Sequence, residues 1–134
     1  MQRVLNGIQQ VNGATWCTLS GGNVVISQIG RYNFEGSTPG YQIASHESYI
    51  VKVSAPFAGN LQGGTMEYSP VGSAQTRSFV QGNIAIIASY IPATYSLNTR
   101  ASANQAATTA LGVASGLLGS EIYSLLKITR TSMT

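Results

Sequence analysis

The stretch YIVKVSAP, residues 49–56, alternates its side chains with a period of two. Val51 and Val53 fall on one face, and Lys52 and Ser54 fall on the other. This pattern is typical of a β-strand with one face on a core and the other face open. A second strand signal, the most apolar in the chain, runs over 79–90 and ends before Pro92. These two segments predict an antiparallel sheet.

Turn residues divide most of the chain up to residue 92 into further strands. Asn-Gly at 12–13 predicts a hairpin near the N-terminus, and Gly-Gly-Asn at 21–23 predicts a second turn. Residues 24–34 and 41–54 are expected as strands, the latter with a candidate break near His46. The composition of 35–40 (EGSTPG) and of 70–76 predicts loops.

The period changes after residue 100. From Ala101 to Leu118 the apolar residues recur at helical spacing, after Asn98, Thr99 and Ser102 as candidate N-caps. A second, shorter helix is expected over 121–127, and 129–134 is expected as a tail. The predicted fold class is therefore α+β: one domain over 1–134, with strands over about 3–92 and two C-terminal helices over about 100–127.

Charge is scarce in this chain. Only 8% of residues are charged, against ~25% in a typical soluble domain. Aspartate is missing, while Ser, Thr, Asn and Gln together make up 45 of the 134 residues. A neutral polar surface lacks the charge repulsion that keeps monomers apart, so the composition favours association with copies of the same chain. The net charge of +3 comes from basic residues spread along the whole sequence.

The sequence offers little for catalysis or metal binding. One histidine and one cysteine cannot build a structural zinc site. A Cys17–His46 dyad would need a reactive thiol, but Cys17 lies in an apolar strand pattern typical of a buried, inert one. We therefore expect a protein that is not an enzyme and has no catalytic residue, metal or cofactor. No apolar run approaches the ~18 residues of a membrane span, so no membrane partner is expected.

Several residues are candidates for contact with nucleic acid. Lys52 is either a solvated lysine on an open sheet face or a phosphate contact on a sheet that serves as an RNA platform. Arg31 leaves the same two readings open, and strand tyrosines such as Tyr90 either pack or stack on bases. The predicted RNA-binding residues are Lys52, Ser54, Arg31 and Tyr90.

The order of three segments resembles the coat proteins of single-stranded RNA bacteriophages, the levivirus group. These segments are the YIVKVSAP strand, the strand 83–91 that ends in Ile-Pro, and the run ALGVASGLLGSEIYSLL over 110–126. The resemblance covers roughly residues 48–128. It implies an antiparallel sheet with an N-terminal hairpin, two C-terminal helices that lie across a partner chain, and an interlocked homodimer.

The resemblance also implies a function. Dimers would assemble in the cytoplasm of a bacterial host into an icosahedral shell, the virion, around single-stranded genomic RNA. In many members the inward sheet face also binds an RNA hairpin and represses replicase translation. Lys52 matches a lysine of the family's strand that contacts RNA, whereas Ile50 stands where the family often has a hydroxyl residue.

Two questions stay open at this point. In strand 83–91, alignment on Pro92 puts Ile84, Ile86, Ala88 and Tyr90 on the RNA face, and a shift of one residue puts Asn83, Ala85, Ile87 and Ser89 there instead. The alternative function is an RNA-free structural subunit, rich in β-strands, of a pilus or a tube.

Overall fold

Strands dominate the part of the chain that the computed structural model describes, namely residues 2–3, 5, 7–8, 15–41, 44–69, 75–101 and 124–134. The only helix in these ranges is a 3₁₀ turn, η1 (Ala88–Tyr90). The strands are β1 (Gln2–Arg3), β2 (Cys17–Ser20), β3 (Asn23–Ile26), β4 (Gly30–Tyr41), β5 (Ala44–Lys52), β6 (Gly59–Gly63), β7 (Glu67–Ser69), β8 (Gln75–Ile86), β9 (Ala93–Ala101) and β10 (Leu125–Ser132).

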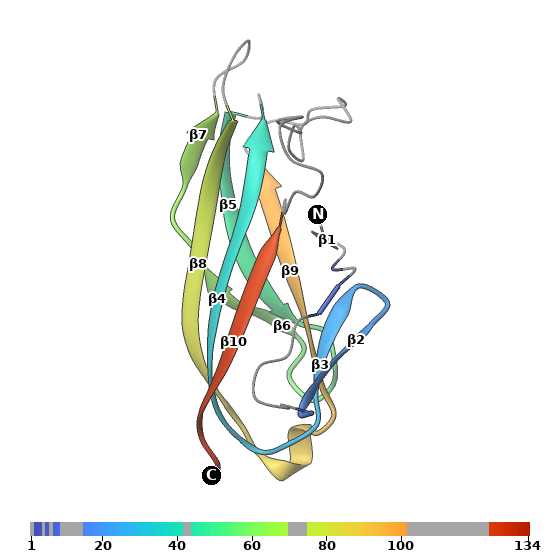
Figure 1. Ribbon diagram of the computed structural model, residues 1–134. Coiled ribbons are helices and arrows are strands. Elements are labelled where there is room, and N and C mark those ends of the chain that lie inside the picture. The colour runs from blue at the N-terminus through green and yellow to red at the C-terminus, as the bar shows by residue number, and fades with distance from the viewer. Residues whose placement is uncertain are drawn as a thin grey trace.

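The strands form two antiparallel sheets. Sheet A has the order β2-β3-β9-β5-β6, with β1 also pairing with β9 and β7 also pairing with β5. Sheet B has the order β10-β4-β8. Figure 1 shows β10, β4 and β8 as one layer of long strands in front of β9 and β5. The described chain is therefore a β-sandwich, whose core lies between the two sheets.

The turn between β2 and β3 confirms one of the sequence predictions. Gly21 and Gly22 have φ values of 59° and 80°, which a residue with a side chain rarely adopts, so glycine is needed at both positions. The single strand expected over 24–34 is wrong. The chain leaves β3 in sheet A, crosses over 27–29 and enters β4 in sheet B.

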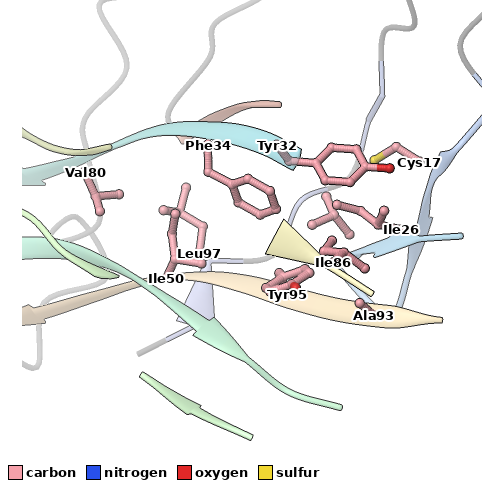
Figure 2. Packing of buried hydrophobic residues seen from close by; sticks show 11 residues of the cluster. Cys17, Ile26, Tyr32, Phe34, Ile50, Val80, Ile86, Ala93, Tyr95 and Leu97 are labelled. Atoms are coloured by element: carbon pink, nitrogen blue, oxygen red, sulfur yellow. The ribbon is translucent and has the colours of Figure 1, made fainter. Parts of the chain in front are cut away.

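Apolar side chains from both sheets meet at the centre of the sandwich (Figure 2). Phe34 of β4 contacts Tyr95 of β9 edge to face, with ring centroids 5.0 Å apart. Leu97 and Ile50 are fully buried beside them. The cluster consists of Cys17, Val24, Ile26, Tyr32, Phe34, Ile50, Val80, Ile86, Ala93, Tyr95 and Leu97.

The loop expected over 35–40 is also wrong, because these residues continue β4 without a break. A Cβ on Gly36 would stand 2.9 Å from Leu97 Cδ1 and 3.1 Å from Val80 Cγ1, so this glycine allows strand and core to approach closely. Pro39 lies beyond the last residue of β4 that pairs with β10, where β8 is its described partner. A proline is tolerated at such a site because one side of the strand needs no ladder donor.

The α+β fold class is contradicted. Asn98 and Thr99, two of the three expected N-caps, lie buried within β9. The strand β10 occupies the end of the expected second helix and most of the expected tail. In β10, Leu126, Ile128 and Arg130 are half-buried while the residues between them are exposed, which is the period of a strand. Ala101, where the first expected helix begins, is the last residue of β9. The rest of that helix, the candidate N-cap Ser102, the Asn-Gly hairpin at 12–13 and most of the loop 70–76 lie outside the described residues.

Candidate functional site

Lys52 ends β5 and points into the sandwich, where it is 4% exposed. Its Nζ donates hydrogen bonds to the backbone oxygens of Ser54, at 2.9 Å, and of Pro56. The ammonium also lies 4.9 Å from the ring centroid of Tyr90 in η1. The alternation predicted for 49–54 is present, but the open face predicted for Lys52 is wrong, because Ile50 and Lys52 lie on the buried face. Through these contacts Lys52 stabilises the conformation of the loop that follows it, residues 53–58.

The same loop is tied to the neighbouring strand β9. Val53 N donates to Thr94 O at 2.8 Å, and Thr94 N donates to Ser54 Oγ at 3.0 Å. The loop therefore has a hydrogen-bonded frame on one side and the Lys52 ammonium beneath it.

Phe57 stands at the outside of this frame. Its φ of 60° lies in the left-handed region, which is unfavourable for a bulky residue. The side chain is 78% exposed and meets the Tyr90 ring edge to face, at 6.1 Å between centroids. Sequence reasoning missed Phe57, although an aromatic residue directly after Pro56, at the end of the YIVKVSAP segment, is a signal that could have pointed to it.

Arg31 lies on the other sheet, apart from this cluster. It is exposed on the outer face of sheet B, between Ala85 of β8 and the end of β10. Arg31, Asn83, Ile84, Ala85 and Thr131 line a hollow of about 440 Å³, which we call the outer-face hollow. The structure thus brings Lys52, Ser54 and Tyr90 together and leaves Arg31 on another surface.

The structure shows which residues of 83–91 are exposed, while their contact with RNA stays a prediction. Asn83 and Ala85 are exposed on the outer face of sheet B, whereas Ile84 is half-buried and Ile86 is buried. Tyr90 does not continue the strand, since η1 follows it.

A second cluster of polar side chains is buried between the sheets. Ser48 Oγ lies 2.8 Å from both Thr38 Oγ1 and Ser78 Oγ, so it joins β5 to β4 and β8. Thr99 and Arg3 extend the network, with Arg3 Nε 2.8 Å from Thr99 Oγ1. Burial, with a contribution from Arg77, lowers the pKa of Arg3 to about 10. These bonds connect the two sheets by directional contacts where apolar packing ends.

His46 sits at the edge of this network, and its Nε2 lies 2.8 Å from Thr76 Oγ1. Its Nδ1 is buried and has no hydrogen-bond partner among the described residues. Burial lowers the pKa of His46, Glu67 acts to raise it, and Arg3 acts to lower it. The His46 side chain is fully buried, so its imidazole does not meet the solvent.

Cys17 is buried in the apolar core, and this burial raises the pKa of its thiol. A high pKa disfavours the thiolate, which is the reactive form. Within the described ranges no three His, Cys, Asp or Glu residues are grouped as metal ligands. In the same ranges no helix is long and apolar enough to cross a membrane.

No protein-family model and no curated protein matches this chain.

Proposed function

We propose that this chain is the coat protein of a self-assembling shell that encloses single-stranded RNA, as the resemblance implies. It would then act as a structural protein of a virion, assembled in a bacterial cytoplasm, rather than as an enzyme. Because the described residues form strands where the resemblance implies helices, the contacts between copies are expected elsewhere. The described residues contain no C-terminal helix that clasps a partner, so the proposal places these contacts on the sheets.

The observation that carries the proposal is a partly apolar surface around Phe79 and Leu125, on the outer face of sheet B. Phe79 and Leu125 both pair with Ser37, from opposite sides, and are 59% and 50% exposed. No described strand pairs with β8 on the side away from β4, or with β10 on its outer side. Open strands with exposed apolar side chains and few charges tend to associate, so a second copy is a natural cover for this surface.

RNA packaging rests on the positive charge of the assembled shell. Arg31 and Lys127 are both exposed on the outer face of sheet B. Lys127 Nζ lies 3.7 Å from Glu35 Oε2. Arg31, in contrast, forms no ion pair with a carboxylate of the described residues. A net charge of +3 is small for one chain, but many copies around one RNA add their phosphate contacts. Among the four proposed RNA-binding residues, Arg31 has the most accessible charge.

The open sheets also favour a second candidate function, an RNA-free subunit of a pilus or tube. A sandwich with an unpaired long strand such as β8 can add a neighbour's strand and continue into a filament.

Expression of the chain alone separates these functions. The assay is size-exclusion chromatography followed by electron microscopy, with the ratio of absorbance at 260 and 280 nm measured on the assembled fraction. Closed particles that hold RNA support the coat function, and RNA-free filaments support the second candidate. A monomer of about 14 kDa at all concentrations contradicts both.

A further inference from the structure

The outer face of sheet B has an apolar end and a polar end. Phe79 and Leu125 mark the apolar end, on either side of Ser37. Arg31 marks the polar end, six residues back along β4, which at ~3.3 Å per residue is about 20 Å away. The apolar end is the surface that we assign to contacts between copies, so the polar end is available for a different partner.

Neutral polar side chains accompany Arg31 at the polar end. One cross-strand row of the outer face, from β10 through β4 to β8, consists of Thr129, Asn33 and Asn83. Glu35 is the only acidic residue in the three strands of sheet B, and it lies in an ion pair four residues along β4 from Arg31. The guanidinium of Arg31 is therefore a positive charge in a neutral polar surrounding.

A β-bulge forms part of the wall of the outer-face hollow. The pairing of β10 with β4 shifts between Arg130 and Ser132, so Thr131 is the extra residue of the bulge. Thr131 is exposed, and its Oγ1 donates to Arg31 O at 3.2 Å. Bulges often lie beside binding sites, where they redirect a side chain. Because the side chain of Ile84 packs toward the core, the hollow is an open, mostly polar depression. Its volume of about 440 Å³ lies within the ~300–1,000 Å³ of small-molecule sites.

Two asparagines at the hollow present a hydrogen-bond donor and an acceptor side by side. Asn33 Nδ2 donates to Asn83 Oδ1 at 3.0 Å across β4 and β8. This bond leaves Asn83 Nδ2 as a donor and Asn33 Oδ1 as an acceptor, neither of which is bonded to another described side chain. The edges of nucleobases also carry donors and acceptors side by side, and asparagine is a common partner for them. The pair of amides can therefore bind the edge of an unpaired base.

We infer that the outer-face hollow binds one nucleotide of single-stranded RNA, with the phosphate on Arg31 and the base edge on the Asn33–Asn83 pair. The inference rests on the proposed function, because it names the residues that hold the packaged RNA. The planar guanidinium of Arg31 offers a fork of N–H donors that fits phosphate oxygens. The exposed methyl group of Ala85 lies beside the pair and gives the base an apolar contact.

Charge complementarity favours RNA over a second copy as the occupant. This chain has only four carboxylate side chains, and Glu35 and Glu47 are already in ion pairs. A second copy therefore offers little to match Arg31, whereas RNA supplies one phosphate for every nucleotide. A second copy and free inorganic phosphate are the competing occupants in the tests below.

The first test compares Arg31→Gln with the matched control Arg100→Gln. Both substitutions remove one positive charge, but Arg100 lies on β9 of sheet A, in an ion pair with Glu47. Fluorescence anisotropy with a labelled single-stranded RNA decamer gives the dissociation constant, and circular dichroism checks the fold. R31Q should raise that constant at least ~tenfold, as the loss of a hydrogen bond to a charged group does, and R100Q should raise it much less. Equal effects of the two substitutions would overturn the inference. Displacement of the decamer by inorganic phosphate at an equal phosphate concentration would reduce the hollow to a simple anion site and also overturn it.

The second test separates the base contact from the phosphate contact. Each protein is titrated with the RNA decamer and with an abasic decamer, which keeps the sugars and phosphates but lacks the bases. The parent should bind the base-bearing strand about tenfold more tightly than the abasic strand, and Asn83→Ala should lose most of this preference. Gln81→Ala is the matched control, because Gln81 is an exposed amide two residues away on β8, and it should keep the preference. The same preference in N83A as in the parent would overturn the base contact.

The outcomes separate the inference from the proposed function. If the unsubstituted chain neither assembles nor binds RNA, the proposed function fails and the inference fails with it. If the chain assembles around RNA, but R31Q keeps the parent's affinity and N83A keeps its preference, only the inference fails. If R31Q weakens the association of copies and leaves RNA affinity unchanged, a second copy occupies the hollow and RNA is rejected. Both expected losses in a chain that stays monomeric would support the inference and reject the shell.

Discussion

Gly64 provides a sharp test of how the two sheets meet at the β8 edge. Its N–H donates to Ser48 O of β5 at 2.9 Å, which holds the connection between β6 and β7 against β5. A Cβ at this position would stand 2.9 Å from the Phe79 carbonyl carbon and 3.0 Å from Ser48 O, and closer still to Phe79 O. Since these obstacles are backbone atoms, no side-chain rotation can relieve the clash.

The cost of Gly64→Ala follows from that geometry. Overpacking costs typically 1–3 kcal/mol, and a clash with backbone should fall in the upper part, about 2–3 kcal/mol. With an unfolding entropy of ~2.1 cal/mol/K per residue, this loss lowers the melting temperature of 134 residues by about 7–11 °C.

The neighbouring glycine is the matched control. A Cβ on Gly63 would meet only Glu47 Oε2, at 3.8 Å, which is an ordinary contact. Gly63→Ala should therefore leave stability unchanged or raise it by about 0.4–1 kcal/mol, because alanine restricts the unfolded chain. Thermal unfolding of both variants at one protein concentration is the assay. Equal melting temperatures for G63A and G64A would refute the packing of this connection against β8.

Three further predictions concern titration, thiol chemistry and RNA. Burial lowers the pKa of His46 from its ordinary 6.5, so the unfolded chain takes up the proton first. The contribution of His46 to stability is therefore complete above pH ~6.5 and is lost as the pH falls through the lowered pKa. Urea unfolding at pH 7.5 and pH 5 should show that His46→Gln loses less unfolding free energy on acidification than the parent. Equal losses in the two proteins would contradict the burial of His46. Cys17 should react with a thiol reagent only after the protein unfolds, so labelling of the folded chain at the rate of a small thiol would argue against its burial. Arg31→Gln should reduce the salt dependence of RNA binding by about one unit of slope, whereas an unchanged slope would remove Arg31 from the RNA contacts.

Local patterns predicted part of this fold well. The Gly21–Gly22 turn depends on backbone freedom that neighbours in the sequence alone confer, and it is present. The alternation over 49–54 was also readable. The helical pattern near the C-terminus gave a wrong prediction where β10 forms, over residues 125–132. The apolar residues at 125, 126 and 128 also fit a strand once β4 supplies a partner.

The candidate site was predicted less completely. Lys52, Ser54 and Tyr90 come together, but both readings of the sequence place Lys52 on an open sheet face, and this is wrong. The opposite sheet packs against the other face of the strand, so Lys52 is 4% exposed while Val53 is 48% exposed. Phe57 and the outer-face hollow are built from segments distant in sequence and could not be found from local patterns.

The sequence by itself determined the scarcity of charge, the strand-rich pattern and several turns, because these depend on composition and near neighbours. The tertiary structure decided that the strands divide between two sheets, that β10 pairs with β4, and that Phe57 and Arg31 stay exposed at one end. Strand pairing joins residues as far apart as Arg31 and Ser132, and their packing depends on partners that no local pattern specifies.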